Sequence, residues 1–380
     1  MQDPRLEKLA AVLVEYSTAV KPGQVVRLSG PTVAEPLLVA LYEKLVQAGA
    51  HVRVRCTPED CEEIFLKHAS AEQLAFVSPL DVEEVKTIDV SIGLWADANT
   101  KALSNIDPKR QGQASSARKP VFKIFMERAA RGELKWCGTL FPTQASAQDA
   151  EMSLREYEDF VFKAGLLHLP DPVAAWKEIH VRQQRVADFL NGKKAVRFRA
   201  ANGTDLTVEV DGMRWINCSG HENFPDGEVF TGPNLKAPHG GVNGRVRFSF
   251  PAVHHGREVE GVELVFERGR VVQAKAEKNE RFLLEMLDQD EGARNLGEIA
   301  IGTNYQIQRF SKNTLFDEKI GGTFHAAVGA GYPETGNSNE SGLHWDMVCD
   351  LRKGGTIEVD GQVISKDGRF VFPDWPAPSA

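Results

Sequence analysis

The sequence predicts an α/β protein with an N-terminal domain built on a parallel sheet, followed by a strand-rich, mostly antiparallel α+β domain. Two domains are expected because the chain has 380 residues, whereas single hydrophobic cores rarely grow beyond about 250–300 residues. Helical and strand-like patterns alternate in the first half, and strand-like patterns dominate after about residue 193. We therefore expect an α/β domain with a helical linker at 1–190 and a strand-rich domain at 191–380.

The N-terminal elements follow from hydrophobic periodicity and from the residues that end helices. Apolar residues recur at helical spacing from Leu6 to Tyr16, and Pro22-Gly23 ends that helix. The elements expected in order are a helix at 6–20, a strand at 24–28, a helix at 32–48, strands at 51–56 and 87–95, a helix at 115–131 and a strand at 134–140. Strands that alternate with helices over short connections predict a parallel sheet covered by helices.

The second half has a different pattern. Residues 154–190 are expected to form two helical pieces separated near Pro170-Asp171-Pro172, which link the domains. Alternating apolar and polar residues then predict strands at 195–199, 206–210, 245–250, 262–267 and 270–276, with one helix at 279–288. Consecutive strands joined by Gly-containing turns favour antiparallel pairing.

Composition excludes several classes of function. The net charge of -8 disfavours a nucleic-acid-binding surface, which needs a basic patch. No segment is apolar and long enough to span a bilayer, and residues 1–7 lack the basic-then-apolar order of a signal peptide. The five cysteines are scattered and form no C-x-x-C pair, which is typical of a reducing compartment. We expect a cytoplasmic protein with neither nucleic-acid nor membrane partners.

Common catalytic and nucleotide-binding motifs are missing from the sequence. It contains no G-x-G-x-x-G, no G-x-x-x-x-G-K-[ST] and no G-x-S-x-G. These motifs are typical of dinucleotide binding, phosphate-loop binding and serine hydrolases, respectively. All three functions are therefore disfavoured.

Carboxylates and histidines gather in the last third, several of them in apolar surroundings. Glu228 follows a Pro/Gly turn, Glu298 lies within an apolar run, and His325 is flanked by small and apolar residues. His344 and Asp346 are two residues apart, so in a strand they point to the same face. A glutamate amid apolar residues is costly to bury without a cation or donor. Taken singly, Glu298 fits the solvated face of a strand equally well, and His325 fits a hydrogen-bonded core position.

Together these side chains predict a metal site. Imidazole and carboxylate donors suit zinc, cobalt or manganese. The set has more donors than one ion needs, which favours two ions that share a carboxylate. Paired ions about 3.5–4 Å apart recur in aminopeptidases and phosphatases. The donors are Glu228, Glu298, Glu318, His325, His344 and Asp346.

These segments, in this order, resemble the M29 family of metallo-aminopeptidases, the thermophilic aminopeptidase T group. The most specific features are Asn223-x-Pro-x-Gly-Glu-Val-Phe-Thr231 and Asn339-x-Ser-x-x-His-Trp-Asp346, and residues 136–166 are also similar. The resemblance implies a homodimer with two divalent ions per chain. It implies metal ligands at Glu228, Glu298, His325, His344 and Asp346, with Glu298 bridging. It also places Tyr332 near the ions, where its hydroxyl stabilises the tetrahedral intermediate. Glu318 fits either a ligand or a solvated loop carboxylate.

The predicted activity is release of N-terminal amino acids from peptides with a free N-terminus by a two-metal-activated water. Glu228 or Glu318 would carry the proton to the leaving amine. One alternative is a mononuclear Fe(II) ring-cleaving dioxygenase of the 2,5-dihydroxypyridine type, which requires loss of one or more glutamates. Another is a non-catalytic binding protein on the same fold. The presence of both Glu228 and Glu298 favours the hydrolase.

Overall fold

The computed structural model describes residues 3–254 and 256–378. These residues form two compact units. The first comprises the chain up to Trp176 together with Gly220–Pro225, and the second comprises Lys177–Ser219 and the chain from Asp226. No helix among the described residues has the length and apolar character needed to cross a membrane.

The first unit is built on a five-stranded parallel sheet in the order β2-β1-β3-β4-β8. Its strands are β1 (Val25–Pro31), β2 (His51–Thr57), β3 (Val90–Trp95), β4 (Lys135–Leu140) and β8 (Asn223–Phe224). Val26 and Leu28 of β1 and Val90, Ile92 and Leu94 of β3 are buried, whereas β2 is a largely exposed edge strand. The predicted parallel sheet is therefore confirmed, and residues 223–224 add a strand that the sequence did not indicate.

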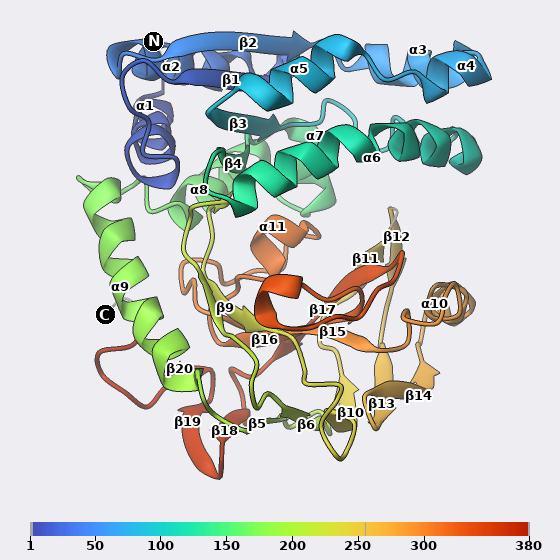
Figure 1. Ribbon diagram of the computed structural model, residues 1–380. Coiled ribbons are helices and arrows are strands. Elements are labelled where there is room, and N and C mark those ends of the chain that lie inside the picture. The colour runs from blue at the N-terminus through green and yellow to red at the C-terminus, as the bar shows by residue number, and fades with distance from the viewer. Residues whose placement is uncertain (1–2, 255, 379–380) are drawn as a thin grey trace. The chain divides into compact units, whose positions relative to one another are not determined.

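Helices precede and connect these strands. They are α1 (Pro4–Ala11), which continues as a π-helix at Val12–Ser17, then α2 (Glu35–Gln47), α3 (Asp60–His68), α4 (Ala71–Ala75), α5 (Pro79–Thr87), α6 (Pro108–Ala130), α7 (Gln144–Asp149) and α8 (Leu154–Ala164), with a 3₁₀ turn at Thr32–Ala34. Figure 1 shows α5 and α6 side by side along the sheet. Ser153 and Glu156 form a capping box that fixes the start of α8. Helix α9 (Pro172–Leu190) follows and leads into the second unit.

The second unit contains two larger antiparallel sheets. The eight-stranded sheet has the order β14-β13-β10-β6-β5-β18-β19-β20. Its strands are β5 (Ala195–Arg199), β6 (Asp205–Glu209), β10 (Val242–Arg247), β13 (Glu263–Glu267), β14 (Arg270–Lys275), β18 (Thr356–Val359), β19 (Gln362–Lys366) and β20 (Arg369–Phe370). The five-stranded sheet has the order β17-β16-β15-β9-β7. Its strands are β7 (Ile216–Cys218), β9 (Glu228–Thr231), β15 (Leu296–Gly302), β16 (Thr323–Gly329) and β17 (His344–Asp350).

Smaller elements also belong to this unit. They are the hairpin of β11 (Ala252–His254) and β12 (Arg257–Val259), and the helices α10 (Glu280–Leu287) and α11 (Thr314–Asp317), with a 3₁₀ turn at Pro333–Thr335. The predicted fold class, with a strand-rich, mostly antiparallel second half, is confirmed.

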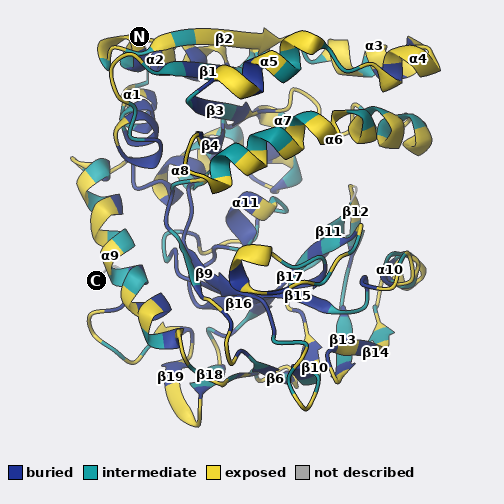
Figure 2. Cartoon of the chain, in the orientation of Figure 1, coloured by how far each residue is buried: buried dark blue, intermediate teal, exposed yellow. Residues whose placement is uncertain are grey.

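The five-stranded sheet is buried at its centre. Every residue of β15 and β16 is buried, and Figure 2 shows these strands in dark blue. Phe324 on β16 stacks on Phe198 of β5 with the ring centroids 4.2 Å apart, so one face of this sheet packs against the eight-stranded sheet. Buried polar side chains of β15 and β16 can therefore lie only on the opposite face of the sheet. They are stable there only if hydrogen-bond donors or cations pair with them.

Candidate metal centre

Strand alternation places the predicted donors on one face of the five-stranded sheet. Successive side chains of a strand point to opposite faces. On β16, Phe324 and Ala326 belong to the hydrophobic core, so His325 between them points away from it. On β17, Trp345 and Met347 belong to the same core, and their neighbours His344, Asp346 and Val348 point to the other face. The same alternation directs Glu228 of β9 away from the buried Val229.

Glu298 lies between the two histidines. Its Oε1 is 3.5 Å from Nε2 of His325, and its Oε2 is 3.4 Å from Nε2 of His344. The side chain is 6% exposed, so the carboxylate is not on a solvated face. Each oxygen of this one carboxylate therefore faces a different imidazole.

The remaining carboxylates complete two groups around Glu298. Nε2 of His325 lies 3.4 Å from Oε2 of Glu228, and Nε2 of His344 lies 3.4 Å from Oδ2 of Asp346. Each group has three ligand atoms within 4.8 Å of one another: Glu228, Glu318 and His325 in one, and Glu298, His344 and Asp346 in the other. The structure thus brings together all six predicted donors, including Glu318.

Both histidines are oriented by backbone carbonyls. Nδ1 of His344 lies 2.9 Å from the oxygen of Ala330, and Nδ1 of His325 lies 3.2 Å from the oxygen of Glu318. Because a carbonyl oxygen can only accept, Nδ1 carries the hydrogen in each ring. A neutral ring then has its lone pair on Nε2, which faces the carboxylates. This arrangement is typical of metal-binding histidines.

Two buried carboxylate oxygens need a positive partner. Oε2 of Glu228 and Oδ1 of Asp346 have no hydrogen-bond partner among residues 3–254 and 256–378. A buried acceptor without a donor costs free energy. The unpaired oxygens lie in groups that also offer imidazole nitrogens. The donor set and its unpaired atoms therefore fit divalent cations.

The charges in this cluster depend on one another. Burial alone would lower the pKa of both histidines, but hydrogen bonding to Glu298 raises the pKa of His325 to about 9, and the charge of Asp346 raises the pKa of His344 to about 12. Burial opposes ionisation of Glu298 as well, yet the two histidines lower its pKa. Burial raises the pKa of Glu318 to about 8, against the attraction of Lys319. The cluster thus favours positive charge at its centre, supplied by protons or by metal ions.

Lys319 is a member of this cluster that the sequence did not reveal. Its Nζ donates to Oε1 of Glu228 at 2.6 Å and to Oε2 of Glu318 at 2.8 Å. Burial would lower its pKa, but the charges of these carboxylates raise it well above the usual value. A lysine followed by Ile320-Gly321-Gly322 was the only local signal, and it does not identify the partner carboxylate 91 residues away.

Tyr332 lies beside the histidine of β17. Its ring meets that of His344 edge-on with centroids 5.2 Å apart, and that of Phe230 with centroids 5.4 Å apart. The residue is 39% exposed, so the side chain is only partly covered by the protein. Partial burial and the charge of Glu298 raise the pKa of this hydroxyl, which therefore keeps its proton at neutral pH.

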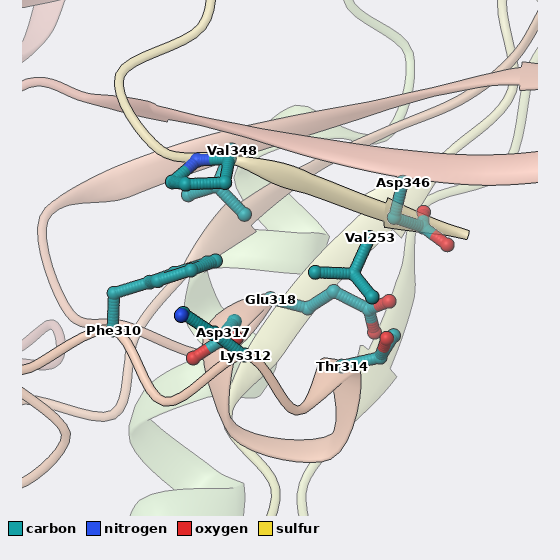
Figure 3. A pocket seen from close by; sticks show the side chains of 9 residues that line it. Val253, Phe310, Lys312, Thr314, Asp317, Glu318, Asp346 and Val348 are labelled. Atoms are coloured by element: carbon teal, nitrogen blue, oxygen red, sulfur yellow. The ribbon is translucent and has the colours of Figure 1, made fainter. Parts of the chain in front are cut away.

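A small pocket of about 30 Å³ opens next to the carboxylates. Glu318 and Asp346 belong to both the pocket wall and the donor cluster. Figure 3 shows their carboxyl groups toward one end of the pocket and the ring of Phe310 toward the other. The remaining lining residues are Pro251, Val253, Lys312, Thr314, Asp317 and Val348. A molecule in this pocket would have apolar contacts and direct access to the carboxylates.

Comparisons with known proteins identify the family of this chain. Residues 2–370 match the family model described as thermophilic metalloprotease (M29). The chain is 30% identical to aminopeptidase 2 of Geobacillus stearothermophilus over 405 residues, which cover 97% of this chain and 95% of that protein. It is 30% identical to aminopeptidase T of Thermus thermophilus over 411 residues, with coverage of 96% and 95%.

Solved structures show the same likeness. The wild-type AmpT structure from Thermus thermophilus superposes with a TM-score of 0.85 at 28% identity, covering 97% of this chain and 99% of that one. The 2,5-dihydroxypyridine dioxygenase of Pseudomonas putida KT2440 superposes with a TM-score of 0.60 at 12% identity over 97% of each chain, which shows a shared fold alone. The family match and the relatives confirm the prediction of a metallo-aminopeptidase, a hydrolase. This chain belongs to the M29 family of thermophilic metalloproteases.

Proposed function

We propose that this metallo-aminopeptidase uses two divalent ions, zinc, cobalt or manganese, to release N-terminal amino acids from peptides with a free N-terminus. The observation that carries the proposal is Glu298, whose two oxygens face two different histidines at 3.5 and 3.4 Å. A carboxylate in this position suits a bridge between two ions. The unpaired oxygens of Glu228 and Asp346 support one ion on each side of it.

We assign the ligands to two halves of the centre. Glu298, His344 and Asp346 would hold one ion, and Glu228, Glu318 and His325 would hold the other. Nitrogen and oxygen donors of this kind accept zinc, cobalt and manganese alike. When bound, the ions supply Lewis acidity and lower the pKa of a water molecule to about 7.

The chain's own residues would then carry the proton and position the substrate. We assign Glu318 as the group that takes the proton from the attacking water and delivers it to the leaving amine. Glu318 lines the pocket, whereas Glu228 does not, so the carboxylate of Glu318 lies where the attacking water and the substrate would meet. Lys319 binds both carboxylates, but only Glu318 also lines the pocket, so Glu228, the other acid–base residue considered, would serve mainly as a ligand.

Tyr332 would stabilise the transition state. Its hydroxyl keeps its proton, so it can donate a hydrogen bond to the oxygen that becomes negative during attack. The pocket beside Glu318 and Asp346 would take the first side chain of the peptide. The free amine would bind to these acidic groups or to an ion, which would restrict cleavage to the first peptide bond.

We also propose that the protein is a cytoplasmic homodimer. The dimer is carried over from the family resemblance, and sedimentation analysis tests it directly. The cytoplasmic location is supported by the cysteines, because none of the five forms a disulfide.

Metal-dependent hydrolysis tests the function. The protein is stripped with a chelator, loaded with zinc, cobalt or manganese in turn, and assayed with aminoacyl amides whose amine is free or acetylated. Hydrolysis of the free-amine substrates alone, with two ions per chain, supports the proposal. Lack of hydrolysis with every metal contradicts it. One iron per chain with ring cleavage of a dihydroxypyridine would favour the dioxygenase, and no bound metal would favour a binding protein.

Substitution of Glu298 tests its assigned place in the centre. Glu298→Gln keeps the shape of the side chain but removes its charge, so turnover should fall below detection and metal content should drop while the fold is kept. The control is Glu267→Gln, a change at an exposed position of β13. Unchanged turnover in Glu298→Gln would remove this residue from the site.

A further inference from the structure

A buried lysine lies against only one half of the proposed metal centre. Lys319 is 2% exposed, and its Nζ is 2.6 Å from Oε1 of Glu228 and 2.8 Å from Oε2 of Glu318. Both carboxylates belong to the group that includes His325. Among the described residues, no lysine or arginine nitrogen lies within 4.0 Å of Glu298 or Asp346 in the other group.

The lysine is held there by its backbone. Its amide donates to the oxygen of Phe316 at 3.1 Å, and its carbonyl accepts from the amide of Asn304 at 3.0 Å. Its two neighbours in the chain are also buried or nearly so, since Ile320 is 0% exposed and the side chain of Glu318 is 14% exposed. The ammonium group is therefore a fixed part of the site and not a mobile surface charge.

This placement makes the two halves unequal in charge. With neutral histidines, the half containing Glu298 and Asp346 has two negative charges. With both carboxylates ionised, as metal ligands must be, the half containing Glu228 and Glu318 has one net negative charge, because Lys319 contributes a positive one. A divalent ion entering the second half meets a positive charge already bound to both carboxylates, and like charges at such short range repel strongly in a buried site.

We propose that Lys319 is an internal cation that balances the Glu228–Glu318–His325 half when no ion is there, so that the two ions bind with unequal affinity. This inference rests on the proposed two-ion function. The half formed by Glu298, His344 and Asp346 fills first and more tightly, and the half next to Lys319 fills second. Lys319 is also a positioning residue, because it binds Oε1 of Glu228 and leaves Oε2 facing His325.

The inference predicts opposite effects on the stability of the metal-free protein and on metal affinity. Removal of one partner from a buried ion pair leaves uncompensated charge and destabilises the fold. Lys319→Met should therefore lower the melting temperature of the metal-free protein, and binding of the second ion should restore it. The same variant should bind the second ion more tightly, since the competing ammonium is gone. A lysine with a merely structural role would weaken metal binding when removed.

The experiment is a competition titration of the metal-free full chain with zinc and a chromophoric chelator. Wild type should bind two equivalents whose dissociation constants differ by at least about tenfold. Lys319→Met should tighten the second equivalent by a similar factor and leave the first unchanged. Lys319→Arg keeps the charge and should preserve the difference between the two. Lys278→Met removes an exposed lysine that pairs with Glu260 and should leave both affinities unchanged.

The outcomes separate this inference from the proposed function. Two equal affinities in wild type, together with hydrolysis, would overturn the role of Lys319 and leave the two-ion enzyme intact. This wild-type titration tests the role of Lys319 even if Lys319→Met does not fold. A weaker second equivalent in Lys319→Met would also overturn the inference. One ion in wild type and two in Lys319→Met would support the role of Lys319 and contradict the two-ion enzyme. One ion in both proteins would overturn both ideas.

Discussion

Nε2 of His344 lies 3.4 Å from Oδ2 of Asp346, although the large side chain of Trp345 separates the two residues in sequence. The pleat of β17 explains this, since Trp345 points into the hydrophobic core and its two neighbours point to the opposite face. The two faces of one strand thus have separate roles. One stabilises the fold, and the other holds the donors.

Substitutions on the two faces should therefore have separable effects. Asp346→Asn removes a charge from the donor face, so zinc affinity should fall by at least about tenfold. The fold should remain intact. Trp345→Phe, its neighbour, should lower the free energy of unfolding by about 1–2 kcal/mol and keep the metal content. Metal analysis and chemical denaturation measure the two effects. Loss of metal in Trp345→Phe with unchanged metal in Asp346→Asn would contradict the assignment.

The hydroxyl of Tyr332 should act in turnover and not in binding. Tyr332→Phe keeps the ring that packs against His344 and Phe230, so metal content and KM should change little. Loss of a hydrogen-bond donor to a developing negative charge should lower kcat by about 10²–10³-fold. Steady-state kinetics of an aminoacyl amide measures both constants. Tyr305→Phe is a matched control, because that hydroxyl donates to the backbone oxygen of Gly368 instead. A rise in KM without a change in kcat would assign Tyr332 to substrate binding.

Local sequence patterns predicted some of this site and missed other parts for a physical reason. His344 and Asp346 are two residues apart and therefore point to the same face of any strand, so this pair could be predicted from the sequence. Glu298 alone was ambiguous, because its burial depends on strands β9 and β16 on either side of it. Lys319 was missed because a loop places it. That loop is fixed by the long-range bond from the amide of Asn304 to the oxygen of Lys319.

The fold, too, contains elements that local sequence predicts and elements that depend on contacts distant in the chain. The parallel strands of the first half and helices α2 and α6 follow periodicity and were predicted, whereas the short helices α4, α5 and α7 were not among the expected elements. Strand β8 was not predicted either, because it has only two residues and pairs with β4 from 85 positions further along the chain. A short strand of this kind has no periodicity of its own. Its register comes from the neighbouring strand.

The pocket beside the carboxylates should select the first side chain of the peptide. Val253 lines it together with Phe310 and Val348, and a larger residue there would fill the space. Val253→Trp should raise KM for substrates with a leucyl or phenylalanyl N-terminus by about 10–200-fold, with a smaller effect on alanyl substrates. Val272→Trp, at an exposed position of β14, should leave KM unchanged for all of these substrates. An equal rise in KM for all substrates would show that the first side chain of the peptide binds outside this pocket.

Asp290 should control the position of His344 in a manner that depends on pH. Its carboxylate accepts from the hydroxyl of Ser341 at 2.8 and 2.9 Å and from the amide of Gly342 at 2.8 Å, directly before β17. Desolvation alone would raise the pKa of Asp290, but the hydrogen bonds from Gly342 and Ser341 outweigh it and lower the pKa. A carboxyl group whose pKa is lower in the folded state stabilises the fold above its unfolded-state pKa, and this contribution is lost as the pH falls through the folded-state value.

Asp290→Ala should therefore lower the free energy of unfolding by about 0.5–1.5 kcal/mol at pH 7, and the difference from wild type should shrink as the pH falls below about 4. Denaturant titrations of the metal-free proteins at pH 7 and at low pH measure this. Because the segment before His344 loses its anchor, zinc affinity at pH 7 should also fall. Asp288→Ala is the control for zinc affinity, which it should leave unchanged, since that exposed carboxylate pairs with Arg294 and not with the segment before β17. A stability difference between Asp290→Ala and wild type that is independent of pH would show that the charge of Asp290 does not support this segment.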